Sequence, residues 1–317
     1  MKTKTLLVAI SLLVSAMMIR CSDDDGDFGS KGTVNVKITD APSDDANIQG
    51  TFITVADVKV DGKSVEGFSK QTIEISAYQN GNAKLLFNED FDAKAYSNIT
   101  LVLDNEADAS GSSPGCYVLD TQNVKHDLSS SSSATTEIKI EKNFMVESNG
   151  TTDLVIDFDL RKSIVHNQET TEPNKYEFVT AAELKSSVRL VVQEKCGDIK
   201  GKATKTSGSG ELIVYAYRKG SFNATTEYQG QGSSNVMFAK AVASSKVNTD
   251  GSYQLSFLEE GDYEIHVASY EKNTTTGKFT FKAMANASSA IAGILLNNIS
   301  VDAESHFELN INVIIVM

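Results

Sequence analysis

The chain has 317 residues, of which 40% are hydrophobic and 22% are charged, and its formal net charge is −13. This length is enough to bury two hydrophobic cores. The acidic balance excludes nucleic acid and anionic membrane faces as expected partners, because binding phosphate groups needs clustered lysine or arginine, and the sequence has no such patch.

The N-terminal segment has the pattern of a secretory signal. Two lysines precede an apolar run over residues 6–18 that is too short to span a bilayer as a permanent helix. Arg20 and Cys21 follow at once, and this arrangement resembles a bacterial lipoprotein signal. The resemblance implies a signal peptide over residues 1–20 and lipidation of Cys21, whose acyl chains would hold the protein on a membrane. Arg20 departs from the usual small residue, a variation that Bacteroidota lipoproteins tolerate. The alternative is an ordinary secreted protein with an incidental cysteine.

An acidic stretch, Ser-Asp-Asp-Asp-Gly-Asp, follows Cys21. It has too few apolar residues to pack a core, so residues 21–31 are expected to form a solvated tether. Acid-rich tracts at this place resemble the export signal that carries lipoproteins to the outer leaflet. The resemblance implies an outer-membrane, lipid-anchored protein at the cell surface. A plain spacer, with the protein on the periplasmic face, is the alternative.

Alternating apolar residues indicate half-buried strands along residues 32–193, separated by turn chemistry such as Asn80-Gly81. The apolar parity changes within residues 51–60, which a strand tolerates only with a β-bulge, expected near Ala56-Asp57. Only residues 181–184 have a helical pattern. The pattern predicts an antiparallel β-sandwich. The alternating triplets are Val34, Val36 and Ile38; Ile99, Leu101 and Leu103; Leu154, Ile156 and Phe158; and Val188, Leu190 and Val192.

Three segments of this first half carry a family resemblance. They are Thr-Asp-Ala-Pro at residues 39–42 after the first strand, Asp-Val-Lys-Val at 57–60, and residues 154–165. Together they resemble a domain of unknown function found in uncharacterised Bacteroidota lipoproteins. The resemblance implies a fold and a cellular location, but no activity.

A second strand-rich region spans residues 196–317. Asp250-Gly251 predicts a hairpin turn, and Gly261 a second chain reversal. The Asp-Gly-Ser-Tyr and Gly-Asp-Tyr spacing resembles the carboxypeptidase regulatory-like domain, a small transthyretin-like sandwich that serves as an accessory module. Residues 221–240 and 283–298 fall outside its usual pattern and are interpreted as insertions, the second with one or two helical turns. Residues 307–313 predict the closing strand.

Besides Cys21, the chain contains Cys116 and Cys196. A disulfide between them is chemically permitted in an exported protein. Two buried free thiols are an equal alternative, because a chain of this size does not need a covalent staple.

The four histidines are scattered, and zinc, nucleophile-elbow and phosphate-loop patterns are absent, so no catalytic, cofactor or metal residue is assigned. Each of two groups of carboxylates has both a functional and a purely structural interpretation. Asp153, Asp157 and Asp159 share one strand face and could serve glycoside hydrolysis, but a solvated outer face is the preferred interpretation. A loop with three aspartates could offer oxygens to calcium, but a tight turn is preferred. The loop aspartates are Asp40, Asp44 and Asp45.

The chain has no tryptophan, so a carbohydrate platform would have to use tyrosine. Tyr253 and Tyr263 fall at core-like strand positions. Four other tyrosines remain candidates for the surface: Tyr215, Tyr217, Tyr228 and Tyr270.

The sequence predicts an all-β chain of two antiparallel sandwiches, residues 32–193 and 196–317, behind a signal peptide and tether. The expected function is that of a non-catalytic, membrane-anchored lipoprotein that binds a glycan, matrix or protein partner or acts as a spacer, without a cofactor. One alternative is a cryptic glycan hydrolase that uses carboxylates such as Asp157 and Asp159. The other is a calcium-stiffened adhesin.

Overall fold

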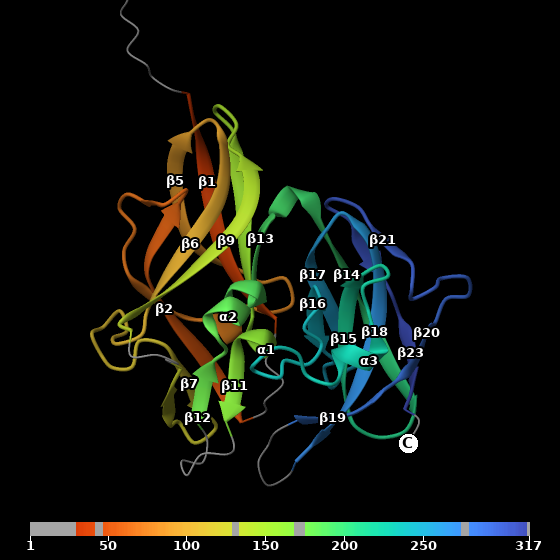
Figure 1. Ribbon diagram of the computed structural model, residues 1–317. Helices are drawn as coiled ribbons and strands as arrows, with labels where there is room; N and C mark the ends of the chain where they lie inside the picture. Colours follow the sequence, from red (N-terminus) through yellow and green to blue (C-terminus); the bar gives the residue numbers. More distant parts are fainter. Residues whose placement is uncertain (1–29, 42–46, 129–132, 168–174, 274–278, 316–317) are drawn as a thin grey trace, which may run out of the picture. The chain divides into compact units, whose positions relative to one another are not determined.

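The computed structural model describes residues 30–315 except 42–46, 129–132, 168–174 and 274–278 (Figure 1). Residues 31–317 form one compact unit. The expected signal peptide, Cys21, the acidic tract, Asp44 and Asp45 all lie outside the described residues. Among the helices that are described, none has both the length and the apolar character needed to cross a membrane.

The first half contains two facing sheets (Figure 1). One has the order β13 (Val188–Val192), β10 (Thr151–Asp159), β1 (Lys31–Ala41) and β5 (Lys84–Asp92). The other has the order β8 (Lys125–Asp127), β7 (Tyr117–Asp120), β2 (Ile48–Val60), β6 (Ala95–Asp104) and β9 (Thr135–Met145), with β3 (Lys63–Ser64) and β4 (Gln71–Glu74) also paired to β2. The smaller elements are the 3₁₀ turn η1 (Ile75–Ala77), the helices α1 (Leu160–Ser163) and α2 (Ala181–Ser187), and the strand pair β11 (Ile164–Asn167) and β12 (Lys175–Phe178).

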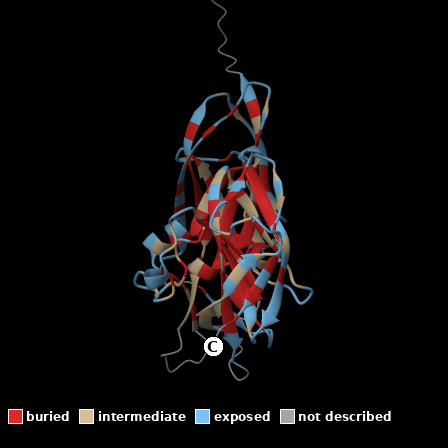
Figure 2. Ribbon diagram, turned by 90° about the vertical axis from the view of Figure 1, so that its right-hand side faces the viewer, coloured by how far each residue is buried: buried red, intermediate tan, exposed pale blue. Residues whose placement is uncertain are grey.

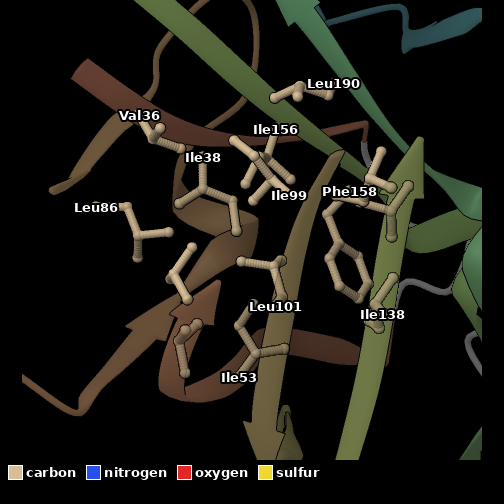
Figure 3. Packing of buried hydrophobic residues seen from close by; sticks show 14 of the residues in the cluster. Val36, Ile38, Ile53, Leu86, Ile99, Leu101, Ile138, Ile156, Phe158 and Leu190 are labelled. Carbon is tan, nitrogen blue, oxygen red and sulfur yellow. The ribbon is translucent and has the colours of Figure 1, made fainter. Parts of the chain in front are cut away.

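The core between these sheets consists of the alternating apolar residues that the sequence predicts. Ile38 of β1 and Ile156 of β10 face Leu101 of β6 in Figure 3, and all three are fully buried. Each such side chain gains about 1.5–3 kcal/mol from leaving water. The alternation of the strands therefore accounts for the position of this core.

Two local predictions are confirmed. The pairing of β2 with β6 shifts register between Val55 and Asp57, which is the expected β-bulge. The helix expected at residues 181–184 is α2, which begins with a capping box: the Thr180 hydroxyl accepts from the backbone N–H of Glu183, and the Glu183 side chain accepts from the Thr180 backbone.

The second half also contains two facing sheets. One has the order β17 (Ser252–Glu259), β14 (Cys196–Ser207), β23 (Ile311–Ile314) and β20 (Asn286–Ser289), with β22 (His306–Glu308) beside β14. The other has the order β16 (Ala243–Lys246), β15 (Glu211–Arg218), β18 (Gly261–Lys272) and β19 (Phe279–Met284), with β21 (Ile299–Val301) beside β18. The 3₁₀ turn η2 (Gln193–Lys195) joins the halves, and helix α3 (Ala224–Glu227) follows β15.

The fold is all-β, as expected, and most strand pairs are antiparallel. Among the strands that the structure describes, three pairs are parallel: β1 with β10, and β14 with both β22 and β23. In each half the first strand thus pairs with strands that come much later in the chain, which ties the ends of that half together.

Three predictions for the second half need correction. The Asp250-Gly251 turn is present, but the strands it joins, β16 and β17, belong to different sheets, so it does not close a ladder hairpin. Residues 283–298 contain strand β20 and turns instead of a helix. The closing strand is interrupted and forms two strands, β22 and β23, both of which pair with β14.

Three of the four tyrosines expected as surface candidates are buried. Tyr215, Tyr217 and Tyr270 pack with Phe238 in a cluster on the outer face of the β15–β18 sheet, and Tyr228 is half-buried beside it. Phe238 belongs to the insertion at residues 221–240, which covers this face. Consecutive residues of β15, from Leu212 to Tyr217, are therefore all buried. Figure 2 shows the buried residues, in red, along the strands inside the body.

Candidate binding groove

The outer face of β10 is solvated only near Asp153, which is half-buried, and the other two aspartates are covered, contrary to the prediction. Asp157 is 6% exposed and Asp159 is 4% exposed. β10 lies inside its sheet, between β1 and β13, and the second half covers its outer face, where Phe257 packs against Val155 and Val191. Sequence alternation shows which residues share a face, but it does not show what covers that face.

Two arginines neutralise these buried carboxylates and also bind the second half. Arg189 of β13 donates to Asp157 Oδ2 from Nε (2.9 Å) and Nη2 (2.6 Å), and from Nη1 to the carbonyl oxygen of Phe257 at 2.8 Å. Arg161 of α1 donates from Nη2 to Asp159 Oδ2 at 3.1 Å and to the carbonyl oxygen of Phe238 at 3.2 Å. Each arginine thus joins a carboxylate of the first half to backbone of the second.

This pairing removes support from the hydrolase alternative. Burial acts to raise the pKa of Asp159, but the nearby Arg161 and Lys162 outweigh it, and the pKa is below its usual value. Asp159 is therefore a carboxylate at neutral pH and a poor proton donor. Asp157 forms a structural ion pair with Arg189, whose Nη2 lies 2.6 Å from its Oδ2.

The Thr-Asp pair at residues 39–40 supports a neighbouring turn. The single hydroxyl proton of Thr39 lies between two carbonyl oxygens, with Oγ1 at 2.9 Å from that of Tyr78 and 2.7 Å from that of Asn82, and it can be donated to either. The Asp40 carboxyl accepts from Gln79 Nε2 at 3.0 Å and from the backbone N–H of Leu160 at 3.3 Å. Both residues are buried, so this part of the motif fixes the loop that carries residues 78–82.

The calcium alternative draws no support from this geometry. Asp40 is buried and engaged by donors from within the fold, whereas a calcium ligand must share a shell of six to eight oxygens. Across the described ranges, no three His, Cys, Asp or Glu side chains come together in a way that could hold a metal ion.

The supported loop ends in the Asn80-Gly81 turn. Both residues have positive φ, 55° and 83°, as a type I′ turn requires. The turn lies close to β17, because a Cβ atom at Gly81 would be 2.9 Å from Gln254 Nε2 and 3.3 Å from Ser256 Oγ. It therefore forms a wall where the two halves of the compact unit meet.

A groove with a cavity volume of about 490 Å³ lies beside this turn. We define the groove by the residues that line it: Asn80, Gly81, Asn82, Asp153, Gln193, Glu194, Cys196, Gly197, Asp198, Gln254, Ser256, Phe257, Glu304 and His306. A second cavity of about the same volume shares Asn80 and Gln254 with the groove and continues along β14 and β17 past Lys200 and Lys202.

Hydrogen bonds fix the polar wall on the second half. Asp198 accepts from Gln254 Nε2 at 3.0 Å and contacts His306 Nδ1 at 2.7 Å. A carboxylate at Nδ1 favours the tautomer with the proton on that atom, which leaves Nε2 as an acceptor. The His306 side chain is 69% exposed, so its Nε2 edge is available to a ligand.

Two adjacent residues on β17 have unusual states. Ser256 Oγ is buried and has no hydrogen-bond partner among the described residues, which costs free energy. Phe257 has a φ of 54°, an uncommon conformation for a bulky side chain. The Asp157–Arg189 pair holds this backbone through the Phe257 carbonyl. Strain of this kind is often kept at functional sites.

The sequence left the state of the two remaining cysteines open, and the structure gives two buried free thiols. Cys116 lies in the core of the first half, and Cys196 lies beneath the groove against Val155 and Phe257. Burial raises the pKa of Cys196 to about 11 and that of Cys116 to about 12, so both are thiols at neutral pH. Neither is an activated nucleophile.

Solved structures resemble the chain only remotely. It aligns over 90% of its length with 35% of the Bacillus anthracis TIE protein (10% identity, TM-score 0.20), so it spans about a third of that protein. It aligns over 89% of its length with 70% of BcpA, the major pilin subunit of Bacillus cereus (10% identity, TM-score 0.22). The same share aligns with 94% of a candidate cell-adhesion protein from Bacteroides fragilis (10% identity, TM-score 0.19).

No curated protein matches the chain. The family model of a domain of unknown function, DUF4382, matches residues 31–179, the region in which the sequence indicated such a domain. The likeness of residues 196–317 to the carboxypeptidase regulatory-like domain stays a prediction. The family match includes Thr39, Asp40 and the Asn80-Gly81 turn, so one wall of the groove is built from the family's own region.

Proposed function

We propose that this protein is a non-catalytic binding module held on a bacterial outer membrane through acyl chains on Cys21 and displayed at the cell surface. The observation that carries the proposal is a pair of arginines, the buried Arg161 and the half-buried Arg189, which join the two halves through charged and backbone contacts. A body joined in this way keeps its groove in a fixed geometry. It can therefore present a binding site or act as a spacer without chemistry of its own.

Further contacts between the halves support a rigid body. Lys142 of β9 pairs with Glu259 of β17, and Lys162 Nζ donates to the carbonyl oxygen of Ala241 at 3.0 Å. Glu183 of α2 accepts from Ser234 Oγ at 2.6 Å and from its backbone N–H at 3.0 Å. Burial acts to raise the pKa of Glu183, but these bonds and those from Thr180 outweigh it and lower the pKa to about 2.

The proposed location at the cell surface is based on the sequence. Cys21 follows a signal-like segment, and the acidic tract after it suits export to the outer leaflet. The first strand, β1, begins at Lys31, so residues 21–30 would separate the acylated cysteine from the body. We further propose that residues 32–193 and 196–317 are two domains of separate families, joined at the groove.

Protease shaving of intact bacteria that produce the full chain tests the proposed lipid anchor and surface display. The wild type should be cell-bound and cut by external protease, whereas Cys21→Ala should be released or left unprocessed, because it lacks the acylated thiol. Ser22→Ala is the matched control, since it changes the neighbouring residue and leaves the cysteine. Blotting of cell and medium fractions reads the result.

Two outcomes would contradict parts of the proposal. If Cys21→Ala stays processed and membrane-bound like the wild type, the lipid anchor is wrong. If the wild type is membrane-bound but resists shaving, surface display is wrong and the chain faces the periplasm.

A further inference from the structure

We propose that the groove binds a short, uncharged oligosaccharide chain, with the Asn80-Gly81 turn and the Gln254–Asp198–His306 array as its polar contacts and Phe257 as its apolar contact. This inference rests on the proposed binding function and names its ligand class. It follows from the charge of the lining, its hydrogen-bonding groups and its extent.

The charge of the groove excludes anionic ligands. Its lining carries four carboxylates and, among the described residues, no lysine or arginine: Asp153, Glu194, Asp198 and Glu304. Lys200 and Lys202 line the second cavity, but with Glu308 there the carboxylates of the two cavities together still outnumber the lysines. Lys37 contacts Asp153 and Gln193 from outside that lining, at 3.1 Å and 2.9 Å. A phosphate, sulfate or uronate would meet like charge without the cationic partner that such groups need.

The polar side chains of the groove are suited to hydrogen-bond with the hydroxyl groups of a sugar. Asn80, Asn82 and Gln254 carry amides, which both donate and accept, and the carboxylates of Asp153 and Asp198 accept. A sugar hydroxyl also donates and accepts, so it can bridge an amide and a carboxylate that lie side by side. Ser256 Oγ, buried and without a partner among the described residues, lines the same groove. A few fixed polar groups in a cavity of this size are typical of small-molecule sites.

Phe257 supplies the apolar contact. Its ring packs on Val155, Val191 and Cys196, and the residue also lines the groove. The C–H face of a sugar ring is apolar and packs on an aromatic surface. Arg189 holds the Phe257 carbonyl at 2.8 Å, so the position of this contact is fixed before a ligand arrives.

The extent of the site favours a chain over a single sugar. The groove and the second cavity share Asn80 and Gln254, and together they run from Glu304 and His306 along β14 and β17. A linear oligosaccharide could occupy both cavities at once, and we therefore expect affinity to rise with chain length.

Calorimetric titration of the full chain with defined sugars tests the proposal. The neutral probes are the di- and tetrasaccharides of cellulose, xylan, mannan and chitin, and the charged probes are tetragalacturonate and trilysine. At least one neutral tetrasaccharide should bind, more tightly than its disaccharide, and tetragalacturonate should not. Trilysine measures how much a cation binds to the carboxylates of the groove through charge alone. Asn80→Gly keeps the positive φ, removes the amide, and should weaken binding by about three- to tenfold, as expected for one lost hydrogen bond. His306→Ala should weaken binding similarly.

Asn149→Gly is the matched control. Asn149 has the same φ of 55° and is exposed, but it is not among the residues that line either cavity. Its variant should bind like the wild type, and thermal melting should show all three variants folded. Failure of every neutral probe, equal binding by Asn80→Gly and Asn149→Gly, or binding of trilysine alone would overturn the glycan assignment. None of these outcomes depends on where Cys21 holds the protein, so the proposed anchor is judged separately by shaving.

Discussion

Arg161→Ala is expected to lower the free energy of unfolding by about 3 kcal/mol or more. Breaking a buried ion pair typically costs about 3–5 kcal/mol, because it leaves a charge uncompensated. Asp159 would retain Lys162, whose Nζ lies 3.1 Å away, so the lower end of that range applies. The carbonyl oxygens of Met237 and Phe238 would also lose their donor. Urea unfolding followed by circular dichroism measures the loss.

A second readout of this variant addresses the junction between the halves. If Arg161 couples them, its removal should split a single unfolding transition into two, because each half keeps its own hydrophobic cluster. Lys139→Ala is the control: Lys139 pairs with Glu141 at an exposed site, so about 0.5 kcal/mol or less is expected. A loss below about 1 kcal/mol for Arg161→Ala, with one transition retained, would show that the arginine does not fasten the halves.

The inner faces of the sandwiches could be predicted because they follow a two-residue period. Val36, Ile38 and Ile99 alternate with polar residues, and all three are buried. The β-bulge near Asp57 could also be predicted, because a change of apolar parity within one strand has few structural solutions. These features depend only on residues close together in sequence.

The outer faces could not be predicted in this way. Asp157 alternates with Ile156 as an exposed residue would, but its partner Arg189 lies 32 residues away and the cover over both comes from the second half. The alternation along their strand likewise suggests that Tyr215 and Tyr217 lie on an exposed face, but residues 221–240 cover that face in the structure. In both cases the missing information is which distant segment packs on the face.

The groove was missed for the same reason. Its lining comes from Asn80, Asp198, Gln254 and His306, which lie on segments far apart in the chain. The sequence shows the turn at Asn80-Gly81, whereas His306 is one of four scattered histidines. No local motif joins them, because the site exists only where β14, β17 and β22 meet the turn.

Asp40→Asn is expected to make the protein more stable than the wild type at pH 7. It should also remove the decrease in the free energy of unfolding that Asp40 causes as the pH rises. Burial raises the pKa of Asp40 well above its ordinary value of 3.8, and the nearby Asp159 and Asp157 raise it further, although the hydrogen bonds from Gln79 and Leu160 oppose this. In the folded protein Asp40 therefore keeps a proton that the unfolded chain releases above about pH 4.

The sign of the effect follows from proton binding. Between the unfolded and the folded pKa, the folded state binds one more proton, so the stability of the wild type falls by about 1.4 kcal/mol per pH unit as the pH rises. Asparagine cannot ionise. It keeps an oxygen for the Leu160 N–H, and its amide can donate to Gln79 once that side chain turns its oxygen inward. The difference between Asp40→Asn and wild type should therefore grow from pH 4 upward.

Asp250→Asn provides a control of opposite sign. The Ser252 hydroxyl and backbone N–H lower the pKa of Asp250, so this carboxylate stabilises the fold above its unfolded pKa and loses that effect as the pH falls. Asp250→Asn should thus be less stable than wild type at pH 7 and approach it at pH 3. Urea midpoints at four pH values read both variants. If Asp40→Asn instead loses stability at pH 7, the Asp40 side chain is ionised in the fold and serves the Asn80-Gly81 wall as a carboxylate.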